Sequence, residues 1–140
     1  MVIFMTILFP ERWLLMHSRK KHLYLCALSL VLGLLFYVLF KSNSYLNAFV
    51  EKLLGIQLGM WLNCNVINHH FCDFLWGFSL TCGLIFILGN NRRVRFLCVT
   101  ISVGYGCLWE LLQLFSIVPG TGDIIDILTY LLASVLAALI

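Results

Sequence analysis

Glu110 is the residue whose type and position most clearly call for chemistry. It is the single charged residue in an apolar run over 96–118, and a charge at mid-bilayer depth costs at least about 2.5 kcal/mol. Gln113 follows three residues later, on the same helical face and one turn nearer the membrane surface. The two residues predict a polar stripe along one helix, suited to binding a cation or exchanging a proton.

The turn PGTGD follows this helix and carries a second acidic residue. Pro119 is expected to end the helix, and Gly120 and Gly122 are free to adopt positive φ. Asp123 then stands where the N-cap of the last helix belongs. Asp126, three residues later, fits two roles: it could complete a capping box at the positive end of the helix dipole, or serve a site one turn into the membrane.

Asp73 and Tyr130 extend this group of polar residues to further helices. Tyr130 stands one turn after Asp126, and Asp73 opens another apolar run after the letters NHHFC. If these helices pack together, five polar residues converge at similar depth: Asp73, Glu110, Gln113, Asp126 and Tyr130. Carboxylates gathered in poor solvent can hold a cation or act as proton donors and acceptors. The alternative is a hydrogen-bonded network that only fixes how the helices pack.

His69 and His70 precede Asp73 and raise the question of a metal site. Adjacent histidines project in different directions from a helix, and neither HExxH nor a pair of CxxC motifs accompanies them. The sequence therefore predicts no bound metal, and it leaves His70 as a neighbour of Asp73. No cofactor is expected.

The elements that position these residues are apolar helices. The 140-residue chain is 62% hydrophobic and only 11% charged, which is more apolar surface than a soluble core can bury. The predicted fold is all-α: a polytopic membrane protein with one transmembrane domain over 23–140. The predicted spans cover about 23–40, 71–89, 96–118 and 124–140. Residues 1–22 are expected to form a basic cytoplasmic lead-in, with Met16 as an alternative start.

Basic residues predict the orientation. Seven of them would lie on one side of the membrane: Arg12, Arg19, Lys20, Lys21, Arg92, Arg93 and Arg95. Only Lys41 and Lys52 would lie on the other, so both termini are expected in the cytoplasm. All the acidic residues except Glu11 are expected in the outer half of the membrane or outside it. The net charge of +3 is the sum over a basic inner side and an acidic outer side, and it predicts no nucleic-acid partner.

The segment between the first two spans, 41–70, is expected to contain an amphipathic helix. Its apolar face would carry Tyr45, Leu46, Phe49, Val50, Leu53 and Leu54, and its polar face Asn47, Glu51 and Lys52. Such a helix either lies in the outer interface, with Trp61 as an anchor, or covers the mouth of the helix bundle.

The six cysteines do not predict a disulfide framework. Four lie within the expected spans as small packing residues: Cys26, Cys82, Cys98 and Cys107. Cys64 and Cys72 would reach the outer side together, where two free thiols are favoured over a bridge.

The segment over about 72–138 resembles the VanZ-like family of small bacterial membrane proteins. In that family a Glu-x-x-Gln pair ends one span, an Arg-containing turn leads to an Asp and an Asn in the next, and an earlier span opens with an Asp near a His. The matching residues are Glu110, Gln113, Asp126 and Asp73 with His69 and His70. The turn PGTGD lacks the Arg, Tyr130 stands in place of the Asn, and Ala133 stands where a Gly is common.

The resemblance implies a cell-envelope protein of the bacterial cytoplasmic (inner) membrane. With the residues above, it predicts binding of a lipid-linked or cationic envelope molecule at an acidic outer-leaflet pocket, with Glu110 as the central carboxylate. Two alternatives stay open: an intramembrane enzyme acting on a lipid-linked substrate, and a helper subunit that docks onto a larger membrane protein. The chain has no nucleophile elbow, metal-ligand set or phosphate-binding loop, so binding is favoured over catalysis.

Overall fold

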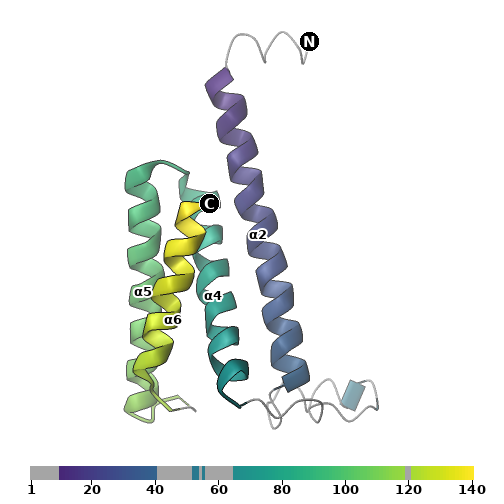
Figure 1. The fold of residues 1–140 in the computed structure, drawn as a ribbon, viewed down its shortest axis with the longest axis vertical. Coiled ribbons are helices and arrows are strands. Elements are labelled where there is room, and N and C mark those ends of the chain that lie inside the picture. The colour runs from purple at the N-terminus through teal and green to yellow at the C-terminus, as the bar shows by residue number, and fades with distance from the viewer. Residues whose placement is uncertain (1–9, 41–51, 54, 56–64, 119–120) are drawn as a thin grey trace.

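The computed structural model describes residues 10–40, 52–53, 55, 65–118 and 121–140. Within these residues the regular structure is helical throughout, which confirms the all-α prediction for the described part of the chain. Four long helices follow one another (Figure 1): α2 (Pro10–Phe40), α4 (Asn65–Leu88), α5 (Arg92–Leu114) and α6 (Ile124–Leu139).

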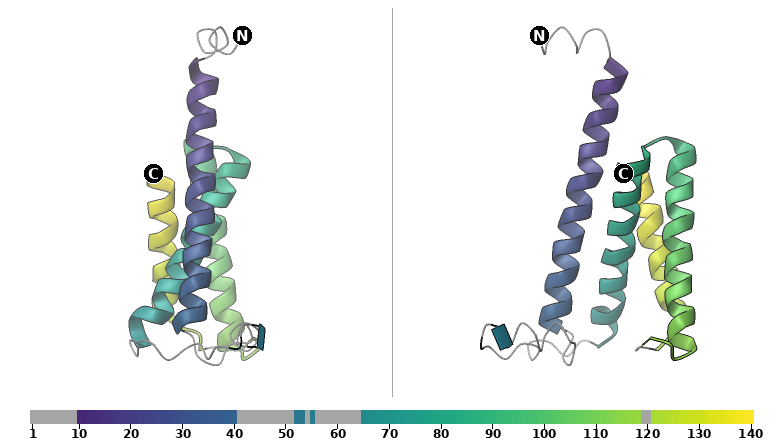
Figure 2. Two further views of the ribbon diagram at one scale, coloured as in Figure 1. Left: turned by 90° about the vertical axis from the view of Figure 1, so that its right-hand side faces the viewer. Right: turned by 180° about the vertical axis from the view of Figure 1, so that it is seen from behind.

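α4 is the central helix. It packs against α2, α5 and α6, and α5 and α6 also pack against each other, whereas α2 packs chiefly against α4. Successive helices run in opposite directions (Figure 1), and α2 extends well beyond the other three at its N-terminal end (Figure 2). The side chains predicted to form a site therefore come from one three-helix unit, α4 to α6.

The helix boundaries differ from the predicted spans by four residues or more at four places: the starts of α2, α4 and α5 and the end of α5. α2 begins at Pro10, so the basic lead-in is helical, and its 31 residues give a length of about 46 Å. α4 begins at Asn65 rather than at 71. A search for apolar runs misses these starts because the residues before each run are largely polar: Arg and Lys, which form helices well, in α2 and α5, and Asn and His in α4.

α5 ends at Leu114, four residues before the predicted end at 118. Ser116 adopts the left-handed region with φ 57°, and its N–H donates to the Gln113 carbonyl oxygen at 2.9 Å. These contacts close the helix before Pro119 is reached. Glu110 therefore lies about one turn from the end of its helix, whereas the predicted end at 118 would place it about two turns away.

Two described helical segments are long and apolar enough to cross a membrane: His70–Leu88 and Arg92–Leu114. α6 is apolar but shorter, at 16 residues. Many large apolar side chains face outward on the described helices, including Phe96, Ile124 and Leu139, each about three-quarters exposed. Such a surface favours association with a membrane.

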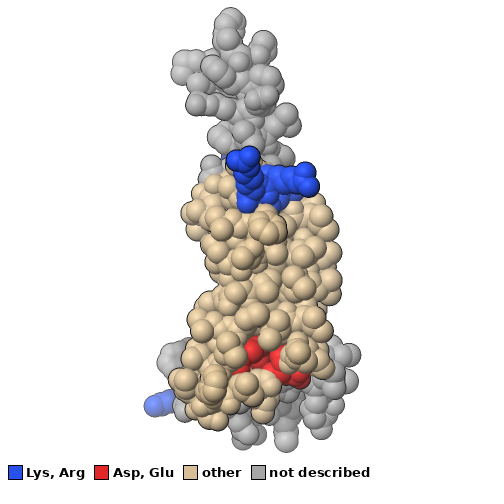
Figure 3. Space-filling model, turned by 90° about the vertical axis from the view of Figure 1, so that its left-hand side faces the viewer, with Lys and Arg blue, Asp and Glu red and all other residues tan. Residues whose placement is uncertain are grey.

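Charge separates along the helices (Figure 3). The basic end carries Lys20 and Lys21 of α2 with Arg92, Arg93 and Arg95 of α5, and the opposite, acidic end carries Asp73, Glu110, Asp123 and Asp126. An uncharged band lies between them. This distribution has the same sense as the predicted one, and the short described segment 52–53 lies at the acidic end (Figure 1).

Some predictions fall outside the described residues. The amphipathic helix expected within 41–70 and its anchor Trp61 belong to this group, apart from Lys52, Leu53 and Gly55, and so does any pairing of Cys64 with Cys72; residues 65–70 of this segment belong to α4. The cysteines predicted to pack inside the spans form no disulfide, and Cys82 and Cys98 are fully buried.

Candidate functional site

At the acidic end, α4 and α6 are joined by an ion pair. His70 Nδ1 lies 2.5 Å from Asp126 Oδ1, and the two side chains are 24% and 13% exposed. Among the described residues this is the one close contact between a basic and an acidic side chain. Asp126 is in the first turn of α6, but its carboxylate reaches across to α4 and does not cap its own helix.

One turn further in, Tyr130 joins the same two helices. Its hydroxyl donates to Asp73 Oδ1 at 3.1 Å. Asp73 follows His70 by three residues and Tyr130 follows Asp126 by four, so each pair shares a helical face and the two contacts lie one above the other. We call His70, Asp73, Glu110, Asp126 and Tyr130 the acidic cluster.

The Tyr130 ring is held in a slot between two glycines. A Cβ added at Gly106 of α5 would lie 2.6 Å from the ring, and one added at Gly77 of α4 would lie 2.9 Å from it. Neither position has room for a side chain unless the ring moves. The slot therefore fixes the ring, and with it the direction of the hydroxyl toward Asp73.

The carboxylates of the cluster are close enough to act on one another. The charges of Asp126 and, more weakly, Glu110 act on Asp73. In poorly solvated surroundings, three carboxylates repel one another unless a proton or a cation is shared among them. Among the described residues, His70 is the one basic side chain in contact with any of these carboxylates: it contacts Asp126, and it is charged only when protonated.

Glu110 also has a role in the turn. It is buried, at 5% exposed, and its Oε2 accepts a hydrogen bond from the Asp123 backbone N–H at 2.9 Å. Asp123 is the N-cap of α6, and its side chain accepts from the Ile125 N–H at 3.0 Å. Glu110 therefore completes the N-terminal cap of α6, a role that the sequence suggested for Asp126.

The turn folds back onto α5, which is why Glu110 can reach it. A Cβ at Gly122 would lie 2.8 Å from the Glu110 carbonyl oxygen. Gln113, in the amide orientation that satisfies both of its groups, donates to the Thr121 carbonyl oxygen at 3.2 Å and accepts from Trp109 Nε1 at 2.9 Å. Gln113 therefore fastens the turn instead of facing the carboxylates.

Sequence reasoning missed the two slot glycines. The spacing in the sequence could have indicated Gly77, because it follows Asp73 by one helical turn, as Tyr130 follows Asp126. The side chain of His69 lies outside the described residues. Within the described part of the chain, no group of three or more His, Cys, Asp or Glu side chains has an arrangement that could hold a metal ion.

Comparisons with protein-family models, with curated proteins and with solved structures found no match to this chain. The VanZ-like resemblance therefore stays a prediction that depends on the quoted residues alone.

Proposed function

We propose that this chain crosses a bacterial inner membrane four times, with the basic end in the cytoplasm. The separation of charge along the helices supports this orientation, because Lys and Arg favour the cytoplasmic side. In this arrangement the acidic cluster lies in the outer leaflet. Chemical labelling of single cysteines at positions 93 and 121 from each side tests it: position 93 should react only from inside and position 121 only from outside.

The function we propose is binding of a cationic group at the acidic cluster, carried by a lipid-linked or free envelope molecule. The observation that carries it is the imbalance of charge: of Asp73, Glu110 and Asp126, only Asp126 has a basic partner among the described residues, which is His70. A cation would relieve the repulsion among the carboxylates. This function fits the VanZ-like resemblance, which implies a role in the cell envelope.

The test is binding of a dansylated alkylammonium probe to the purified protein in maltoside micelles. Asp126→Asn removes one cluster charge at constant size and should weaken binding about tenfold or more. Asp123→Asn is the matched control, because it also removes one negative charge at this end while Asn remains a good N-cap. Equal affinity of the two variants would reject the site.

Glu110→Gln separates the two roles of Glu110. Gln can still accept the Asp123 N–H, so the turn should stay folded while the cluster loses a charge. We expect weaker probe binding with little change in melting temperature. A folded variant that binds like the wild type would show that Glu110 serves the turn alone.

A second candidate function is acid–base catalysis on a lipid-linked substrate. The contact between His70 Nδ1 and Asp126 Oδ1 favours it, because a carboxylate at Nδ1 holds the proton there and leaves Nε2 as a base. Catalysis predicts a pH-dependent turnover that disappears in both His70→Gln and Asp126→Asn and persists in Asp123→Asn. Turnover that survives both substitutions would exclude it.

A further inference from the structure

A second group of polar side chains lies at the basic end, around the last residues of α6. Arg95 Nη1 of α5 donates to the Ala138 carbonyl oxygen at 2.8 Å. Lys21 Nζ of α2 donates to the Ile140 backbone oxygen at 3.5 Å. These cations suit the C-terminal end of a helix, where carbonyl groups lack partners within the helix.

His22 follows Lys21 directly in α2, and the positive charges of Lys21 and Arg95 both act on its ring. Its side chain is 0% exposed, and among the described residues neither Nδ1 nor Nε2 has a hydrogen-bond partner. A buried polar group without a partner costs about 1–3 kcal/mol. Burial lowers the pKa of His22, and the positive charges of Arg95 and Lys21 lower it further. The ring is therefore neutral near pH 7, with one N–H to donate.

The donors at this end exceed the acceptors. Arg95 has five N–H groups and Lys21 three, and each makes one of the hydrogen bonds given above. The acidic residues whose side chains the structure describes, Asp73, Glu110, Asp123 and Asp126, all make their contacts at the acidic end, so none of these four pairs with the cations. The ligand that fits is an anion with several acceptor oxygens.

We propose that Lys21, His22 and Arg95 form a binding site for a phosphate group at the inner edge of the helices. A phosphate offers oxygens to the Arg fork, the Lys ammonium and the His N–H at once. Basic sites between membrane helices on the cytoplasmic side are a known way to hold lipid headgroups. The phosphate would come from an anionic phospholipid or from free inorganic phosphate. The proposal does not depend on the acidic cluster.

The experiment follows the His22 imidazole by NMR in protein labelled with ¹⁵N at its four histidines. The protein is held in maltoside micelles, which contain no phosphate. The signal of His22 is the one lost in His22→Gln. Inorganic phosphate is added in one arm, phosphatidylglycerol in a second, and a diacylglycerol without phosphate in a third.

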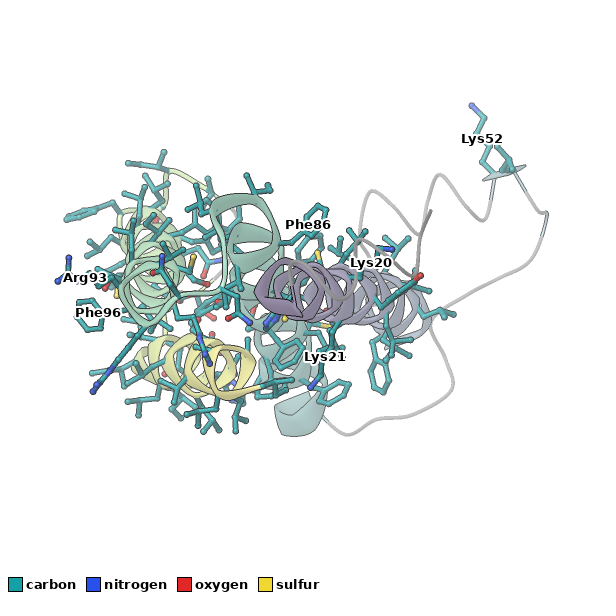
Figure 4. The ribbon with its side chains drawn as sticks, turned by 90° about the horizontal axis from the view of Figure 1, so that it is seen from above. Lys20, Lys21, Lys52, Phe86, Arg93 and Phe96 are labelled. Atoms are coloured by element: carbon teal, nitrogen blue, oxygen red, sulfur yellow. The ribbon has the colours of Figure 1, made fainter. Side chains whose placement is uncertain are left out.

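We expect the pKa of His22 to rise with phosphate, with phosphatidylglycerol or with both, and to stay unchanged with diacylglycerol. A response to one probe alone identifies the source of the phosphate. Lys21→Gln and Arg95→Gln should each weaken the response about fivefold. Arg93→Gln is the matched control, because Arg93 points away from α6 on the far side of α5 (Figure 4).

Two results would overturn the proposal. One is an unchanged His22 signal with both phosphate-containing probes. The other is a response of equal strength in the wild type, Lys21→Gln and Arg95→Gln, which would reflect only the general charge of the surface. Lys21 is exposed, so Lys21→Gln is expected to fold even if Arg95→Gln does not.

Discussion

The two ends of α6 are held by opposite charges, each matched to the helix dipole. At the N-terminus, Glu110 and Asp123 accept backbone N–H groups. At the C-terminus, Lys21 and Arg95 donate to backbone oxygens. Acidic groups at the start and basic groups at the end of a helix both stabilise it.

The ends differ in how far along the chain their partners lie. Glu110 and Asp123 are 13 positions apart, so α5, the turn and α6 can form the N-terminal cap of α6 as one hairpin. The basic end joins residues 43 and 119 positions apart, so it requires assembly of α2 and α5 around α6. The two ends also differ in hydrogen bonding. At the basic end, neither ring nitrogen of the buried His22 has a hydrogen-bond partner among the described residues.

The largest effect should come from filling the Tyr130 slot at the acidic end. Gly106→Ala places a Cβ 2.6 Å from the Tyr130 ring and should destabilise the protein by about 3 kcal/mol. Gly104→Ala, two residues away on α5, meets no atom within 4 Å and should be neutral or stabilising by up to about 1 kcal/mol. Thermal unfolding in micelles compares them. Equal melting temperatures for Gly106→Ala and Gly104→Ala would contradict a tight fit of the Tyr130 ring against Gly106.

Removing the Glu110 acceptor should have the next largest effect. Glu110→Ala leaves the Asp123 N–H without its partner and should cost about 2 kcal/mol. Glu110→Gln keeps an acceptor and should cost clearly less. Unfolding by denaturant measures both variants, and an equal loss in the two would mean that the carboxylate charge, not the hydrogen bond, holds the turn.

At the basic end, Arg95→Met should destabilise the protein by about 1.5 kcal/mol. It removes a charged donor from the Ala138 carbonyl oxygen while keeping an apolar stem. Arg93→Met removes an exposed charge of the same helix and should change stability by less than about 0.5 kcal/mol. Hydrogen exchange should show the difference in the last turn of α6. Unchanged protection there would argue against the contact.

The smallest effect should be a pH dependence carried by His22. Its pKa is lowered in the folded protein, so the unfolded chain binds a proton more readily, and stability must fall as pH drops through the ordinary value of 6.5. The slope for one proton cannot exceed about 1.4 kcal/mol per pH unit. The wild type should therefore lose more stability between pH 7 and 5 than His22→Asn. Parallel curves would contradict a buried neutral His22.

The sequence predicted much of this arrangement because the strongest signals are local. Apolar runs predicted the all-helical fold, and basic residues predicted which end carries positive charge. The end of α5 was misplaced because Ser116, a residue with no special preference for the left-handed region, ends the helix before Pro119. That conformation depends on the turn packing back onto α5.

Within the acidic cluster, spacing could predict which residues share a face but not which partners meet. His70 with Asp73, and Asp126 with Tyr130, are visible as pairs in the chain. The cross-helix contacts of His70 with Asp126 and of Tyr130 with Asp73 depend on the relative height of α4 and α6. Glu110 was placed too deep because its partner, Asp123, reaches it only through the fold of the turn. The sequence did not predict that His22 is buried, because its burial depends on how α2 packs against the other helices.

The slot around Tyr130 also limits how this protein can change over evolutionary time. Any side chain at position 77 or 106 would compete with the Tyr130 ring for the same space, although the three residues belong to three helices. A related chain that carries Ala at 106 is expected to carry a smaller side chain than Tyr at 130, and it would then lose the hydroxyl that reaches Asp73. The three positions should therefore vary together, and the acidic cluster should vary with them.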